Sequence, residues 1–122
     1  MQNLDQIRAA AALKLLPAGK AHDFDRSDIA SIPALILSNG LLPAAAFCCE
    51  QGKEARAGMK TAFDGIASFL KDRGIVATNV STGQQLIADL ASKDSDTLHR
   101  ATTEALSYLA VLKRFALPKG KE

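Results

Sequence analysis

The chain is short of several residue types, and each shortage narrows what the protein can be. It has no Trp, one Tyr and five Phe in 122 residues, so few aromatic rings are available to stack on nucleobases. No apolar run approaches the roughly 18 residues that a membrane-spanning helix needs, and the N-terminus has no signal-peptide pattern. β-branched residues are sparse, whereas Ala and Leu supply much of the 48% hydrophobic content. This composition favours helices over strands.

The two cysteines, Cys48 and Cys49, are adjacent. Neighbouring residues rarely reach disulfide geometry without strain, and the pair follows the apolar run 41–47, so we expect buried free thiols. Free thiols are typical of a reducing compartment, and we expect a cytoplasmic protein. A redox or metal-binding pair is the alternative interpretation. Because His22 and His99 are the only further soft ligands and fit no known spacing, we expect no metal and no cofactor.

The motifs of common enzyme classes are also absent. Gly52-Lys53 is followed by Glu54, and no Gly stands at position 47, so there is no phosphate-binding P-loop. The acidic segment 23–28 lacks the Gly and Glu of a calcium-binding EF-hand. No nucleophile elbow or zinc-protease motif occurs. We therefore predict that the chain is not an enzyme and assign no catalytic residue.

Hydrophobic spacing predicts a single domain, residues 1–122, folded as an all-α bundle of about six helices. The expected helices are 3–16, 31–39, 42–50, 56–73 and 81–91, with a last one that begins near Asp94 or Ser95. Asn3 with Gln6, and Ser81 with Gln84, have the spacing of capping boxes. Pro33 is expected in the first turn of its helix, where a missing N–H costs little. Helices 31–39 and 42–50 are apolar almost all round, which predicts burial.

The last helix carries the most informative pattern, because residues 98–116 hold no Gly or Pro and show two distinct stripes. Arg100 and Arg114 fall on one stripe, near Thr103 and Ser107, about 21 Å apart along a helix. Six apolar residues share another stripe and are expected to pack together: Leu98, Ala101, Ala105, Tyr108, Leu112 and Phe115.

Positive charge is concentrated at this C-terminal end. Residues 98–122 hold five Lys or Arg against two acids, whereas the other 97 residues hold ten against eleven. Cations near a helix C-terminus can simply complement the helix dipole. They can also bind phosphates, which requires cations along a track and no exact spacing. With so few aromatic residues, any nucleic-acid contact should go to the backbone and lack sequence preference.

Three stretches resemble one known family: Ile32–Pro43 running on to Phe47, His99–Leu106 continuing to Ala116, and the compatible start Asp5-x-x-Arg8-Ala9. The family is the small helical subunit of the type III-B CRISPR RNA-guided effector, the Cmr complex. The resemblance touches both ends and the middle of the chain in the same order. The chain departs from it at Cys48-Cys49, where aliphatic residues are expected, and in the polar connection 51–58.

The resemblance implies a non-catalytic subunit of an antiviral ribonucleoprotein. Several copies are then expected to stack along the complex by self-association, to contact the larger backbone subunit, and to line the channel where guide RNA pairs with target RNA. Arg8, Arg100, Lys113 and Arg114 coincide with positions that are basic in the family, and we expect them to be RNA-binding, with Arg100 and Arg114 as phosphate clamps. The alternative is a purely structural protein–protein spacer whose arginines pair with acids on a neighbour.

Overall fold

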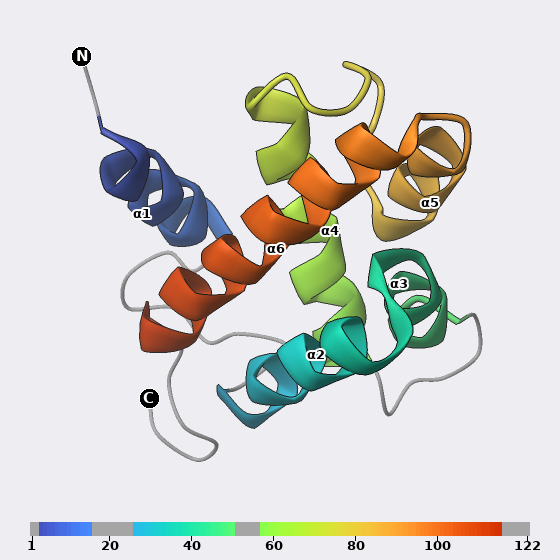
Figure 1. The fold of residues 1–122 in the computed structure, drawn as a ribbon. Helices are drawn as coiled ribbons and strands as arrows, with labels where there is room; N and C mark the ends of the chain where they lie inside the picture. Colours follow the sequence, from blue (N-terminus) through green and yellow to red (C-terminus); the bar gives the residue numbers. More distant parts are fainter. Residues whose placement is uncertain (1–2, 16–25, 51–56, 116–122) are drawn as a thin grey trace.

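The computed structural model describes residues 3–15, 26–50 and 57–115 of the chain. Within these ranges it forms six α-helices and no strand, which confirms the predicted all-α class (Figure 1). The helices are α1 (Leu4–Leu15), α2 (Arg26–Asn39), α3 (Leu41–Cys48), α4 (Ala57–Asp72), α5 (Gly83–Ala91) and α6 (Ser95–Phe115). None of these helices is both long enough and apolar enough to cross a membrane.

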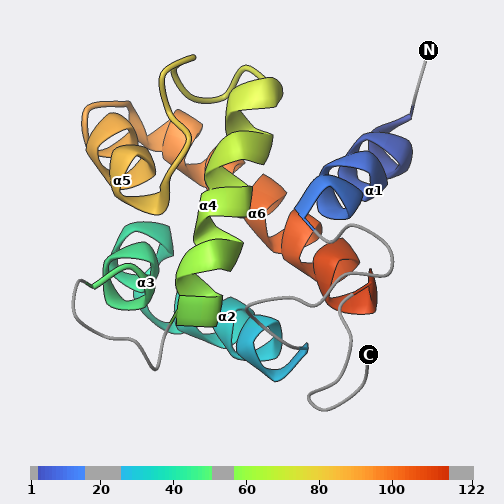
Figure 2. The same cartoon turned by 180° about the vertical axis from the view of Figure 1, so that it is seen from behind.

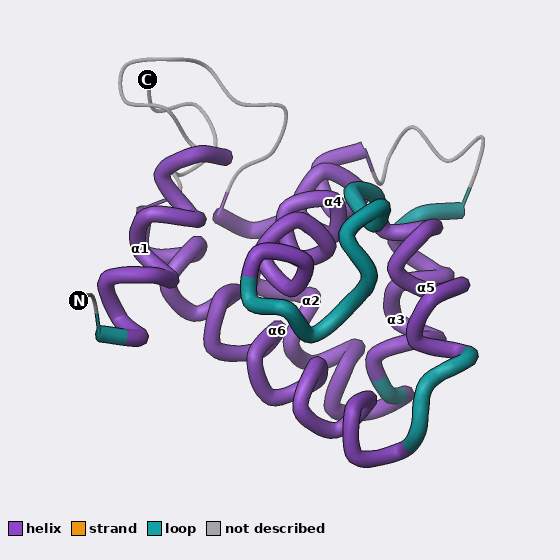
Figure 3. The backbone as a smooth tube through the Cα atoms, turned by 90° about the horizontal axis from the view of Figure 1, so that it is seen from above, coloured by secondary structure: helices purple, strands orange, loops and turns teal. Residues whose placement is uncertain are grey.

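The central helix is α4, which contacts all five of the others. In the view of Figure 2, α4 lies in front of α6, with α1 on one side and α3 and α5 on the other. From above, α3 and α5 lie side by side at one end of the molecule and α1 lies at the opposite end (Figure 3). Burial of α4 on several sides follows from its sequence: Phe63, Ile66, Ala67, Phe69 and Leu70 are all at most 2% exposed.

The predicted capping box at the start of α1 is confirmed. The Asn3 side chain accepts a hydrogen bond from the Gln6 N–H, and the Gln6 side chain accepts one from the Asn3 N–H, both at 2.8 Å. Two backbone donors that the helix leaves without partners are thereby satisfied. The predicted continuation of this helix to Leu16 lies outside the described residues.

The predicted start of α2 is wrong. The helix begins at Arg26, five residues before the predicted start at Ser31, and Pro33 lies in its interior rather than in its first turn. Ile29 and Ile32 are fully buried and continue the stripe of Ile36, so core packing holds the helix together upstream of the proline. Tertiary burial here outweighs the loss of one backbone hydrogen bond at Pro33.

The predicted burial of α2 and α3 is only partly right. Ile36, Leu41, Ala44 and both cysteines are buried as expected, but Leu37 is 75% exposed and Phe47 is 41% exposed. Residues 29–49 contain no charged side chain, so the outer face of this helix pair is uncharged from Ile29 onward. The stop at Asn39-Gly40 is confirmed, because Gly40 adopts a φ of 93°, which side-chain-bearing residues rarely do.

The capping box of α5 lies one residue later than predicted. Thr82, not Ser81, is the N-cap; its side chain accepts from the Gln85 N–H, and the Gln85 side chain accepts from the Thr82 N–H. Gly83 follows in close contact with α3, since a Cβ at this position would overlap the Sγ of Cys49. Its N–H donates to an Asp64 carboxylate oxygen at 2.9 Å, which fixes α5 against α4.

Helix α6 begins at Ser95, with Asp94 as its cap. The Asp94 carboxylate accepts from the Thr97 N–H at 2.8 Å, and this hydrogen bonding lowers the pKa of Asp94. The predicted apolar stripe is largely confirmed, because Ala101, Ala105, Tyr108 and Leu112 are buried. Leu98 is half-buried against the core, and Phe115, in the last turn, is 41% exposed.

Candidate nucleic-acid interface

The outward face of α6 is a continuous stripe with a cation near each end. Side chains spaced three or four apart share one face of a helix, and here that face is formed by Asp96, Arg100, Thr103, Ser107, Ala110 and Arg114. All of them are exposed except Ser107, which is half-buried. The hydroxyl of Thr103 donates to the His99 carbonyl. The middle of the stripe, Thr103, Ser107 and Ala110, carries no charged side chain.

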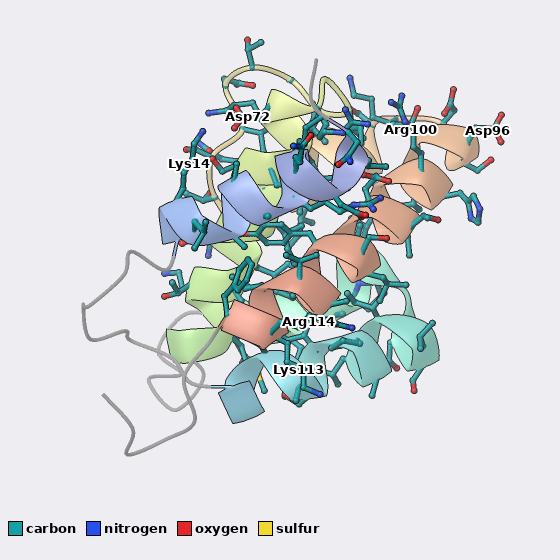
Figure 4. The ribbon with its side chains drawn as sticks, turned by 90° about the vertical axis from the view of Figure 1, so that its left-hand side faces the viewer. Lys14, Asp72, Asp96, Arg100, Lys113 and Arg114 are labelled. Carbon is teal, nitrogen blue, oxygen red and sulfur yellow. The ribbon has the colours of Figure 1, made fainter. Side chains whose placement is uncertain are left out.

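The three α6 cations predicted to bind RNA are all exposed. Figure 4 shows Arg100 towards one end of the helix and Lys113 with Arg114 at the other. Within the described part of the chain, none of these three side chains forms an ion pair. Asp96 stands one helical turn before Arg100 without closing an ion pair to it (Figure 4), so the positive potential is weaker at that end.

Arg8, the fourth predicted RNA contact, is placed differently. Its side chain is 15% exposed and donates to the Glu104 carboxylate at 3.0 Å, joining α1 to α6. Arg73, just after α4, approaches the other oxygen of Glu104 at 3.9 Å. Two guanidinium groups therefore share one half-buried carboxylate, and Arg8 has a structural role inside the protein. The structure does not group Arg8 with the cations on the outward face of α6.

The Arg8–Glu104–Arg73 cluster was missed by the sequence analysis. Arg8 Nε, Arg73 Nε and Glu104 Oε1 are buried and make no hydrogen bond, so the cluster is held by charge more than by hydrogen-bond geometry. One signal was available: Glu104 is the single acid between residues 97 and 121, and it directly precedes the core residue Ala105. A lone carboxylate beside a packed stripe requires a cationic partner.

The cysteine pair has the environment of inert thiols. Cys48 and Cys49 are 1% and 2% exposed and carry no disulfide, which confirms the predicted burial. Burial, with a smaller contribution from the Asp64 carboxylate, raises the pKa of Cys49 to about 11. No three His, Cys, Asp or Glu side chains are grouped to hold a metal ion in the described ranges.

Comparison with protein families decides the identity of the chain. The family model of the CRISPR-associated protein Cas_Cmr5 matches residues 4–117, a span that includes all six helices. The chain belongs to the Cas_Cmr5 family. Comparisons with curated proteins and with solved structures gave no match.

Membership of the Cas_Cmr5 family confirms the resemblance found in the sequence. A Cas_Cmr5 chain is a subunit of the CRISPR Cmr complex, and the family is a small structural subunit rather than the catalytic one. Other Cmr subunits and RNA are therefore its implied partners. The exposed cations of α6 therefore belong to a subunit of a complex for which RNA is an implied partner.

Proposed function

We propose that this Cas_Cmr5 chain is a non-catalytic, cytoplasmic subunit that stacks along the complex and holds guide and target RNA through backbone phosphates. The observation that carries the proposal is the outward stripe of α6, with Arg100 and Arg114 exposed at its two ends and small neutral side chains between them. Lys113 adds a third exposed cation beside Arg114. Arg8 is occupied by Glu104, so the proposal rests on the three α6 cations.

The geometry suits a backbone contact without sequence preference. Arg100 and Arg114 lie about 21 Å apart along the helix, too far to grip one phosphate and far enough to hold two well-separated ones. A guanidinium group binds a phosphate oxygen through charge-assisted hydrogen bonds. The stripe between them offers Thr103, Ser107 and Ala110, which present no aromatic surface for base stacking.

The test compares Arg100→Ala/Arg114→Ala with a matched control in the reconstituted complex. The control is Lys60→Ala/Lys93→Ala, which removes the same charge from exposed positions away from the α6 stripe. We expect the arginine variant to bind target RNA about tenfold more weakly, or worse, because two charge-assisted contacts are lost. The slope of log K against log salt concentration should become shallower by about 1.4 to 1.8, and the control should leave it unchanged.

Two results would count against the phosphate contacts. RNA binding equal to that of the parent at every salt concentration would remove any role for these arginines. An equal loss in the control would show that only net charge matters. Either result leaves membership of the complex untouched, since that rests on the family match.

The alternative, a spacer that contacts protein only, is favoured by the uncharged face of α2 and α3. That face exposes Leu37 at 75% and Phe47 at 41%, an apolar surface that protein partners cover more readily than RNA does. Crosslinking of the assembled complex separates the two functions. Peptides of α6 crosslinked to RNA support the phosphate contacts, whereas α6 peptides crosslinked solely to acidic segments of neighbouring subunits support the spacer.

A further inference from the structure

A groove of about 390 Å³ opens where α1 and α4 meet over α6. Gly65 and Ser68 of α4 line this groove, and their small size leaves its volume unfilled. Its size is at the lower end of the range for ligand sites in proteins. The lining that matters chemically comprises Lys14, Asp64, Ser68, Phe69, Asp72 and Tyr108.

Tyr108 is the most unusual part of this lining. Its side chain is 1% exposed and stacks on Phe69, with ring centroids 4.9 Å apart and planes 16° apart. Its hydroxyl makes no hydrogen bond to any part of the chain that the structure describes, and burial raises the pKa of the phenol well above its ordinary value. A phenylalanine would fill the same space and stack in the same way. Packing therefore does not explain the hydroxyl, which lines the groove and is available to a group that enters it.

The charges of the groove select the kind of group that could enter. Asp64 uses one carboxylate oxygen to accept from the Gly83 N–H, which leaves acceptor capacity on the other. Asp72 lies 3.9 Å from the Lys14 ammonium, and both side chains are more than half exposed, so this pair is loose (Figure 4). With two carboxylates against one ammonium, the groove favours a cation and repels a phosphate.

We propose that this groove receives an arginine side chain from another protein subunit of the Cmr complex. A guanidinium group offers five N–H donors in one plane, which suits two acceptors, the free Asp64 oxygen and the Tyr108 oxygen, better than a compact ammonium does. Asp72 lies eight residues further along α4, about 12 Å, and contributes negative charge to the groove. The inference rests on the proposed function in one respect, since it takes this chain to stack against neighbouring protein subunits. The contact is distinct from the outward stripe of α6, because Tyr108 is buried in the groove whereas Arg100 and Arg114 are exposed.

The first experiment uses the isolated chain, so it does not depend on RNA or on assembly. Ethylguanidinium, a mimic of the arginine side chain, is titrated into ¹⁵N-labelled protein at millimolar concentrations, with neutral ethylurea and anionic dimethyl phosphate as matched probes. We expect saturable shifts of the Gly65, Ser68 and Tyr108 amides with ethylguanidinium alone. Absence of saturation, or the same shifts with dimethyl phosphate, would overturn the proposal.

Two variants test the residues. Tyr108→Phe should weaken ethylguanidinium binding severalfold while leaving the melting temperature unchanged or higher, because the hydroxyl serves no internal bond. Asp64→Asn should weaken it about tenfold and still accept from the Gly83 N–H; Asp96→Asn, outside the groove, should have no effect. A marked fall in the melting temperature of Tyr108→Phe would show that the hydroxyl serves the fold and would overturn the argument.

The second experiment tests the partner in the assembled complex. The combined variant Asp64→Asn/Tyr108→Phe should dissociate from the complex about tenfold faster than the parent chain, both with and without RNA present. Dissociation at the parental rate would overturn the assignment of a protein partner. Loss of RNA retention with normal assembly would instead concern the proposed function and its phosphate contacts.

Discussion

The two sides of α4 are built differently. On one side α3 and α5 pack closely through uncharged groups, with Gly83 pressed against Cys49 and both residues buried. On the other side α1 meets α4 and α6 through ion pairs, Arg8 with Glu104 and Lys14 with Asp72, and leaves a groove between the helices. The comparison teaches that one half of this small fold is fixed by close uncharged packing, whereas in the other half ion pairs add to the apolar contacts of α1 and a groove remains open.

The largest expected effect concerns the closely packed side. With its pKa raised to about 11 from 9.0, Cys49 holds about a hundredfold less thiolate at neutral pH than an ordinary cysteine. Labelling of the folded chain with a maleimide at pH 7 should therefore be more than a hundredfold slower than labelling of the unfolded chain. The neutral thiol is the form that the fold favours, so stability should fall as the pH rises from 9 towards 11. Rapid labelling of the folded chain would show that this side opens readily.

The next effect is steric. Gly83→Ala places a Cβ against the Sγ of Cys49 and 3.2 Å from the Cβ of Phe63, so we expect about 3 kcal/mol of destabilisation by urea unfolding. Combining it with Cys49→Ala should recover part of that loss, because the Sγ is removed while the Phe63 contact remains. Strict additivity of the two substitutions in the double-mutant cycle would contradict the contact.

On the charged side, Glu104→Gln should cost about 2 kcal/mol in the free energy of unfolding. It leaves two half-buried guanidinium groups, Arg8 and Arg73, without their shared anion. Asp5→Asn is the matched control, since Asp5 also lies near Arg8, at 3.8 Å, but is 92% exposed. The control should stay within about 0.5 kcal/mol of the parent. Equal losses of stability from the two substitutions would contradict the inference that the buried partner of Arg8 stabilises the fold more than the exposed one.

The smallest effect is expected from the outward arginines. Arg100→Ala/Arg114→Ala should change the free energy of unfolding by less than about 0.5 kcal/mol, since neither side chain forms an ion pair within the described residues. Differential scanning calorimetry of the isolated chain measures this directly. A loss of unfolding free energy as large as that of Glu104→Gln would show that these arginines stabilise the fold and are not free for binding.

Much of the fold followed from local patterns, and the errors have specific physical causes. Helical spacing located the six helices, and the Asn3–Gln6 box and the Gly40 stop were correct because both depend on neighbouring residues. At α5 the sequence offers two equivalent boxes, Ser81 with Gln84 and Thr82 with Gln85. The choice depends on where Gly83 meets Cys49 and Asp64, which lie far away in the sequence.

The candidate site shows the same limit. The spacing of α6 predicted that Arg100 and Arg114 share one stripe, and the exposure of both is confirmed. The family resemblance groups Arg8 with them because its position is basic in the family, but its partner, Glu104, is 96 residues away. A single sequence does not distinguish a cation that holds helices together from one that faces solvent, since the difference depends on long-range packing.

The charged attachment of α1 has a consequence for heating. Hydration of ionic groups becomes less favourable as temperature rises, so the desolvation cost of the Arg8–Glu104–Arg73 cluster falls on warming. The gain from apolar contacts grows little over the same range. The ionic part of the attachment of α1 should therefore weaken little on warming.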